Sequence, residues 1–137
     1  MSGPALKALR ADLTTHLAQG LDATAPMLGQ LVNPPAVVVG PGTPYVTASG
    51  YCSDEILFDA TIIAPPGDLA AVIDALDDMI DEVRATLRTP SSLAQSGGAF
   101  QYGFREVSGP IAYPAGDEKG TTLPAVVVTV AVGRDAP

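Results

Sequence analysis

The chain has almost none of the residues on which most enzyme and metal sites depend. Its 137 residues include one cysteine, one histidine and no tryptophan. A single cysteine, Cys52, excludes an intramolecular disulfide and a thiolate zinc cluster. Asp54 and Glu55 follow it closely, and acidic neighbours disfavour a reactive thiolate. With His16 as the only imidazole, a metal site would need carboxylates alone, so we expect structural roles for both residues.

Basic residues are also scarce. Seven Lys and Arg face fifteen Asp and Glu, giving a net charge of −8 and a pI near 4.2. This balance opposes general attraction to phosphate backbones or anionic lipid. Only four Tyr and three Phe are available for stacking on bases. The longest apolar run, residues 125–132, is too short to span a membrane, so we expect a soluble, cytoplasmic chain without membrane contact.

Glycine, proline and apolar residues are plentiful. The chain has 14 Gly and 13 Pro, and 47% of its residues are hydrophobic. The apolar content is enough for a core, and the breakers predict many turns. At this length a single domain over residues 1–137 is expected.

Two segments have helical periodicity. Leucines recur every three or four residues from Pro4 to about Gln19, and a longer apolar stripe runs from Leu69 to Leu87. Asp68 precedes the second helix as a candidate N-cap. The outer face of that helix is acidic, which indicates a solvated face or a contact with a basic partner, with a metal site as the weakest interpretation. Its carboxylates are Asp74, Asp77, Asp78, Asp81 and Glu82.

Four segments are predicted to be strands: residues 36–39, 55–65, 100–107 and 123–133. In the second, Ile56, Phe58, Ala60 and Ile62 alternate with more polar residues, which predicts one buried face. Residues 21–33, 42–54, 89–98 and 110–122 are predicted connectors or loops, with a brief extended piece possible at 45–47. The order predicts an α+β two-layer sandwich, α-β-β-α-β-β, with two helices on one face of a mainly antiparallel four-stranded sheet.

The sequence contains no recognisable catalytic motif. We find neither a phosphate-binding loop followed by Lys and Ser or Thr, nor the Gly-x-Ser-x-Gly elbow of hydrolases. Gly40-Pro41-Gly42 is better explained as a turn, because Pro41 removes an amide donor. The alternating Phe100, Tyr102 and Phe104 are predicted to share one side of a strand, as core or as a contact surface. We therefore expect no enzymatic activity, no cofactor and no metal.

The arrangement as a whole resembles the tail terminator proteins of long-tailed bacteriophages, also called minor tail or tail-completion proteins. The resemblance covers nearly the full length and rests on five stretches. They are the opening leucine helix, the entry to the first strand at 33–39, the strand at 58–63 leading into the long helix, the Gly-Ala-Phe-Gln-Tyr-Gly-Phe stretch at 98–104, and the apolar closing strand.

The resemblance implies a structural virion protein that acts at the head-tail junction after assembly in the host cytoplasm. It implies a homo-hexameric ring that caps the head-proximal end of the tail tube and stops its polymerisation. The implied partners are other copies of the chain, the tail tube protein and a neck or head-completion protein. DNA would pass through the ring without specific binding, and the negative charge would keep it from adhering.

Long loops on a small scaffold usually carry its contacts. From the two loops at 42–54 and 110–122 we therefore select candidate interface residues. They are Tyr45, Val46, Tyr51, Asp117, Glu118 and Lys119.

Other functions remain open from the sequence. A head-tail connector or stopper would form a ring of twelve or bind the portal. A small ligand-binding or regulatory module would be a monomer or dimer with a closed pocket near the aromatic strand. An enzyme is the third alternative, although no constellation of residues supports one.

Overall fold

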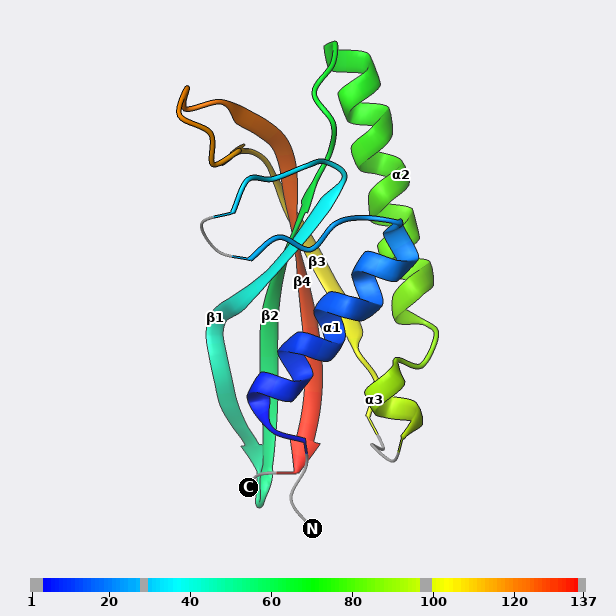
Figure 1. Ribbon diagram of the computed structural model, residues 1–137. Coiled ribbons are helices and arrows are strands. Elements are labelled where there is room, and N and C mark those ends of the chain that lie inside the picture. The colour runs from blue at the N-terminus through cyan, green and yellow to red at the C-terminus, as the bar shows by residue number, and fades with distance from the viewer. Residues whose placement is uncertain (1–3, 28–29, 97–99, 136–137) are drawn as a thin grey trace.

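The computed structural model describes residues 4–27, 30–96 and 100–135, which form a long, twisted sheet with helices packed against one face (Figure 1). The elements are α1 (Leu6–Leu21), β1 (Ala36–Gly50), β2 (Ser53–Ile63), α2 (Leu69–Leu87), α3 (Ser92–Gln95), β3 (Gly103–Pro114) and β4 (Thr122–Asp135). The strand order is β1-β2-β4-β3, and neighbouring strands are antiparallel. The predicted α+β two-layer fold is confirmed, with the one-turn α3 added.

Both predicted helices are present. α2 begins and ends where the apolar stripe does, and the Asp68 carboxylate accepts a hydrogen bond from the Ala71 amide at 2.9 Å. This contact satisfies one of the free amides of the first helical turn. α1 runs two residues past its predicted end, to Leu21, and is closed by Asp22 in the left-handed region with φ 50°.

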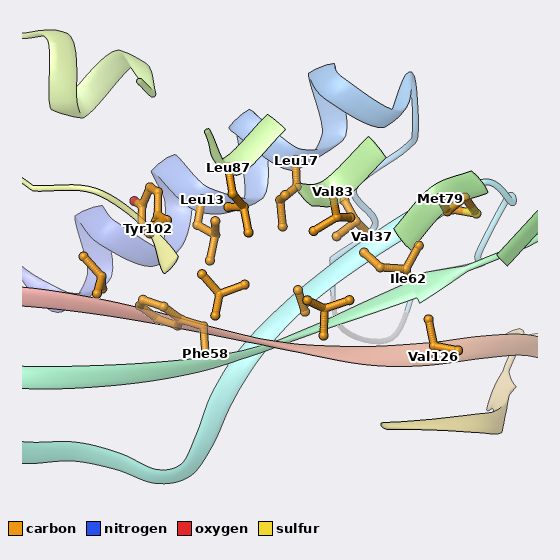
Figure 2. Packing of buried hydrophobic residues seen from close by; sticks show 14 of the residues in the cluster. Leu13, Leu17, Val37, Phe58, Ile62, Met79, Val83, Leu87, Tyr102 and Val126 are labelled. Atoms are coloured by element: carbon orange, nitrogen blue, oxygen red, sulfur yellow. The ribbon is translucent and has the colours of Figure 1, made fainter. Parts of the chain in front are cut away.

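The main core lies between the helices and the sheet. Leu13 and Leu17 of α1 and Val83 of α2 point toward the sheet, where Phe58 and Ile62 face them (Figure 2). The predicted buried face of β2 is confirmed, because Ile56, Phe58, Ala60 and Ile62 are all fully buried. Alternate valines of β4 complete this layer: Val126, Val128, Val130 and Val132.

The opposite face of the sheet is covered only at one end. There the chain before β1 and the loop between β3 and β4 cross the sheet. A hydrogen bond joins the two segments, because the Val32 amide donates to the Ala115 carbonyl at 2.9 Å. A second small cluster is buried beneath them: Val32, Ala36, Ile63, Ala115, Leu123 and Ala125. The rest of this face has no layer over it among the described residues.

The predicted loop at 42–54 is wrong for most of its length. β1 continues to Gly50, and β2 already begins at Ser53. The pairing is interrupted between Pro41 and Val46, then resumes with Val46 opposite Ile56. An edge strand tolerates proline and a bulge because one side of its backbone has no partner strand, so these breakers displace the strand without ending it.

The boundaries of the third strand were also wrong. β3 covers Gly103–Pro114 instead of 100–107, so Phe100 and Tyr102 precede it. The predicted loop at 110–122 shrinks to 115–121, since pairing passes over an irregularity between Ser108 and Ile111. The predicted linker at 89–98 contains α3, whose N-cap Ser91 accepts a hydrogen bond from the Ala94 amide.

Candidate interaction surfaces

The β1–β2 hairpin ends in an exposed aromatic side chain. Tyr51 is 99% exposed at the tip, beside Cys52, which adopts the left-handed conformation with φ 65°. Val46, farther along β1, is 40% exposed. Tyr45 differs from these candidates, because it is half-buried and packs edge-on against Phe58, with ring centroids 5.9 Å apart. The hairpin therefore presents Val46 and Tyr51 outward and uses Tyr45 for the core.

Two carboxylates near the hairpin tip, Asp54 and Glu55, are paired with arginines. Arg134 lies 3.5 Å from Asp54 in a mostly buried pair, and Arg105 lies 3.2 Å from Glu55 in an exposed one. Arg134 also donates to the carbonyl of Pro4 at 2.9 Å, which ties the start of the chain to the end of β4. Residues 46–53 at the tip are uncharged, and Asp135, which pairs with Ser53 in the sheet, is an exposed carboxylate beside them without a salt bridge among the described residues.

The loop between β3 and β4 holds the other candidate residues. Asp117, Glu118 and Lys119 are all exposed. Asp117 closes the loop by accepting a hydrogen bond from the Thr121 amide at 2.9 Å. Hydrogen bonding to Thr121 lowers the pKa of the Asp117 carboxyl. Asp117 thus shapes the loop, while Glu118 and Lys119 extend from it.

The structure does not bring the two groups of candidate residues together. Ser53 at the start of β2 pairs with Asp135 at the end of β4, whereas Pro114 pairs with Thr122 at the other end of the sheet. The β1–β2 hairpin and the β3–β4 loop therefore lie at opposite ends of the long strands, as Figure 1 shows. Placed in this way, they could bind two different partners, or they could meet each other between neighbouring copies in a head-to-tail contact.

Sequence reasoning missed an apolar groove beside the start of α2. In the C-terminal half of the helix the apolar stripe is buried, but in the first turns Leu69 is 75% and Ile73 is 47% exposed. Between these turns and the far end of the sheet lies a groove of about 410 Å³. It is lined by Pro66, Gly67, Val72, Pro110, Ile111, Ala112, Thr122, Leu123 and Pro124. The apolar stripe of the sequence extends to Leu69, which is a signal for an apolar surface at the start of α2. That this surface is exposed depends on where the sheet ends, which the stripe does not show.

The acidic face of α2 is exposed, as its spacing predicts. Its five carboxylates, from Asp74 to Glu82, are all exposed to solvent. Asp77 and Asp81, like Asp74 and Asp78, stand one helical turn apart and repel each other. None of them has a salt-bridge partner among the described residues. This face concentrates the negative charge away from the hairpin.

The aromatic stretch belongs mainly to the core. Tyr102 is buried, and its hydroxyl donates toward Asp12 Oδ2 at 2.8 Å and the Leu9 carbonyl at 3.0 Å. Burial, together with the hydrogen bond to Asp12 and the charge of that residue, raises the pKa of Tyr102 far above its ordinary value. Phe100 packs edge-on against Tyr102, and Arg84 covers the ring of Phe104 at 4.4 Å.

His16 has a structural position at the edge of the core. Its Nε2 lies 2.8 Å from the Thr86 carbonyl oxygen and 3.1 Å from that of Thr89. A ring N–H at this atom donates to the Thr86 carbonyl in the last turn of α2 and to the Thr89 carbonyl just beyond the helix. His16 therefore links α1 to the end of α2.

The uncovered part of the sheet face is shallowly hollowed. A concavity of about 560 Å³ lies over β2 and β4, bounded by Thr43 from β1 and Arg105 from β3. Its floor mixes Leu57 and Val127 with Asp59. The mixture of charged, polar and apolar side chains is typical of a solvated sheet face.

No cluster of three or more His, Cys, Asp or Glu side chains that could hold a metal occurs within 4–27, 30–96 and 100–135. Among the helices in these ranges, none is long and apolar enough to cross a membrane. The exposed features that stand out are the hairpin tip, the apolar groove and the acidic helix face.

Comparison with known proteins gives no family for the chain: neither a protein-family model nor a curated protein sequence matches it.

Proposed function

We propose that this protein is a tail terminator of a long-tailed bacteriophage, a structural virion protein that forms a ring on the head-proximal end of the tail tube. In this role it stops polymerisation of the tube and provides the joint to the neck. The proposal rests on the resemblance of the sequence over nearly its full length. The single structural observation that supports it is the placement of exposed contact features at the two opposite ends of one long sheet.

This placement suits a ring because of how closed rings are built. In a ring each copy uses one surface to contact the next copy and a different surface to contact the previous one. The β1–β2 hairpin with Tyr51 and the groove bordered by Ile111 lie at opposite ends of the strands. A subunit of this kind has two different contact surfaces pointing away from each other.

The charge distribution also fits a protein through which DNA passes. A net charge of −8 on each copy gives a ring a strongly negative field, which keeps DNA from adhering to it. The acidic face of α2 supplies much of this charge. A ring whose channel is lined by basic side chains would contradict this part of the proposal.

The test is the absolute mass of the purified protein, measured by light scattering over a concentration series, with negative-stain images of any large species. We expect assembly into hexameric rings, in solution or on added tail tubes. A ring of twelve that binds portal would indicate a connector or stopper instead. A monomer or dimer that does not bind tail tubes and does bind a small molecule would overturn the proposal.

A further inference from the structure

We propose that the tip of the β1–β2 hairpin, with Tyr51 as its anchor, inserts into the apolar groove beside α2 of a neighbouring copy. The inference deepens the proposed function and rests on it, because a ring needs a contact that repeats between copies. It names the two surfaces that meet and the residue that joins them.

The groove needs an apolar occupant. Val72 of α2 lines one side, and Ile111 of β3, on the other side, is 41% exposed. Leu69 and Ile73, near Val72 on the same helix, are exposed as well. No residue lining the groove is charged. Contiguous exposed apolar surface of this kind, with polar surroundings, marks a protein contact.

The same chain carries a matching occupant. Large exposed apolar side chains among the described residues fall into three groups: the groove rim, the hairpin, and Met27 with Leu31. Of these only Tyr51 lies in the turn between β1 and β2, at the end of the sheet, where its side chain is 99% exposed. Tyrosine is favoured in contacts because it buries a large apolar surface with little loss of side-chain freedom. A groove of about 410 Å³ has room for this ring and for part of the turn that carries it.

Charge favours a second copy as the partner. Two chains of charge −8 repel each other, so copies associate most easily through surfaces without net charge. Residues 46–53 at the hairpin tip are uncharged, and Asp54 and Glu55 behind them are paired with Arg134 and Arg105. The groove lining is uncharged, while unpaired acid is concentrated on the outer face of α2. Both surfaces of the proposed contact are therefore neutral regions of an acidic protein.

Geometry makes the contact one between copies. The hairpin and the groove lie at opposite ends of the sheet, so one chain cannot fill its own groove with its own hairpin (Figure 1). The contact is head-to-tail and leaves a free hairpin and a free groove at the ends of each partial assembly. Such a contact gives a ring when its rotation closes and an open filament when it does not, and the proposed function requires closure.

The native cysteine provides a direct test. Cys52 follows Tyr51, so insertion of Tyr51 brings the Cys52 thiol to the rim of the neighbour's groove. In an Ile111→Cys variant, a mild added oxidant should join Cys52 of one copy to position 111 of the next. Disulfides form only when the Cα atoms are within roughly 7 Å. We expect a ladder of covalent oligomers on a non-reducing gel, which reductant collapses to monomer. Val72→Cys, on the α2 side of the groove, serves as a second reporter position.

Matched variants separate this contact from others. The wild type and the Ile111→Cys/Cys52→Ser double variant each lack one thiol of the pair and should give no ladder. Lys7→Cys, at an exposed position on α1, should give none with Cys52 present. Tyr51→Ser in the Ile111→Cys background keeps both thiols but removes the anchor, and should reduce the ladder at least several-fold.

The outcomes are decisive in both directions. Dimers of Ile111→Cys/Cys52→Ser would indicate groove-to-groove association and overturn the inference, as would dimers of the wild type through two hairpin tips. Absence of crosslinks from both reporter positions in samples that light scattering shows to be rings would overturn this contact and leave the proposed ring function intact. Absence of any assembly, with or without tail tubes, would contradict both.

Discussion

Gly20 of α1 lies directly against Thr86 of α2, with no space for a Cβ atom between them. The two helices cross at this point, close to the bond between His16 and the Thr86 carbonyl. We expect Gly20→Ala to lower the free energy of unfolding by about 1 kcal/mol or more, because the overpacking cost of about 1–3 kcal/mol exceeds the better helix propensity of alanine. Thermal or urea unfolding monitored by circular dichroism measures the change.

A second glycine gives the control for this substitution. A Cβ atom at Gly40 would meet nothing within 4 Å. Gly40→Ala should therefore leave the free energy of unfolding within about 0.5 kcal/mol of the wild type. If Gly20→Ala proved as stable as Gly40→Ala, the close crossing of α1 and α2 would be contradicted.

The Tyr102 hydroxyl joins the segment before β3 to α1. Removing it in Tyr102→Phe takes a hydrogen-bond donor from the Leu9 carbonyl and from one carboxylate oxygen of Asp12. The other carboxylate oxygen of Asp12 still accepts from the Leu93 amide at 3.0 Å. We expect a loss of about 1–3 kcal/mol in the free energy of unfolding. Chemical unfolding at neutral pH gives this value, and an unchanged midpoint would show that the hydroxyl contributes nothing.

The raised pKa of Tyr102 predicts a pH dependence at the alkaline end. An unfolded tyrosine loses its proton near pH 10, whereas the folded protein keeps the proton on Tyr102 to higher pH. Above about pH 10 the unfolded state therefore binds fewer protons than the native state, so stability falls as pH rises. The difference in unfolding free energy between the wild type and Tyr102→Phe should shrink over this range. A difference that stayed constant would contradict the buried position of the hydroxyl.

Asp117 shapes the β3–β4 loop through Thr121. Because hydrogen bonding lowers its pKa, the Thr121 amide resonance should respond to acid with a midpoint below the usual range for aspartate. Asp117→Ala should abolish that response and increase hydrogen exchange at the Thr121 amide. Glu118→Ala, the adjacent exposed position, should leave both unchanged. NMR measures both quantities, and an identical titration in the two variants would remove the role given to Asp117.

The start of α2 depends on its cap. Asp68→Ala removes the acceptor for the Ala71 amide and should cost about 1 kcal/mol of stability. Asp68→Asn keeps an acceptor oxygen and should recover most of the loss. Equal stability of the two variants would indicate that the helix begins without help from this side chain. Because Leu69 and Ile73 follow the cap, its loss should also weaken the proposed hairpin contact.

The local patterns of the chain predicted the interior elements well. α2 follows from its apolar stripe and from Asp68, and the buried face of β2 follows from the alternation around Phe58. β1 was cut short in the prediction because Pro41 and Pro44 normally end strands. They are tolerated here because β1 is an edge strand, a fact set by long-range pairing.

The contact surfaces were predictable only in part. Exposed positions at a turn were expected to include Tyr51, and it is the most exposed large apolar residue described. Tyr45, taken from the same segment, packs on Phe58, because its side chain lies on the face of β1 that meets the main core. The length of the apolar stripe gave a partial signal for the groove beside Ile111, but its exposure could not be foreseen, because it depends on how the first turns of α2 lie against the end of the sheet.

The central claim is that this protein closes the end of a tail tube, and the most direct measurement is the length of tubes grown in its presence. Purified tail tube protein should be polymerised with and without the chain, and the tubes imaged by negative stain with a tagged copy located on them. We expect added chain to stop growth and to appear as a ring at one end of each tube. Tubes of unchanged length, with the chain absent from their ends, would contradict the account.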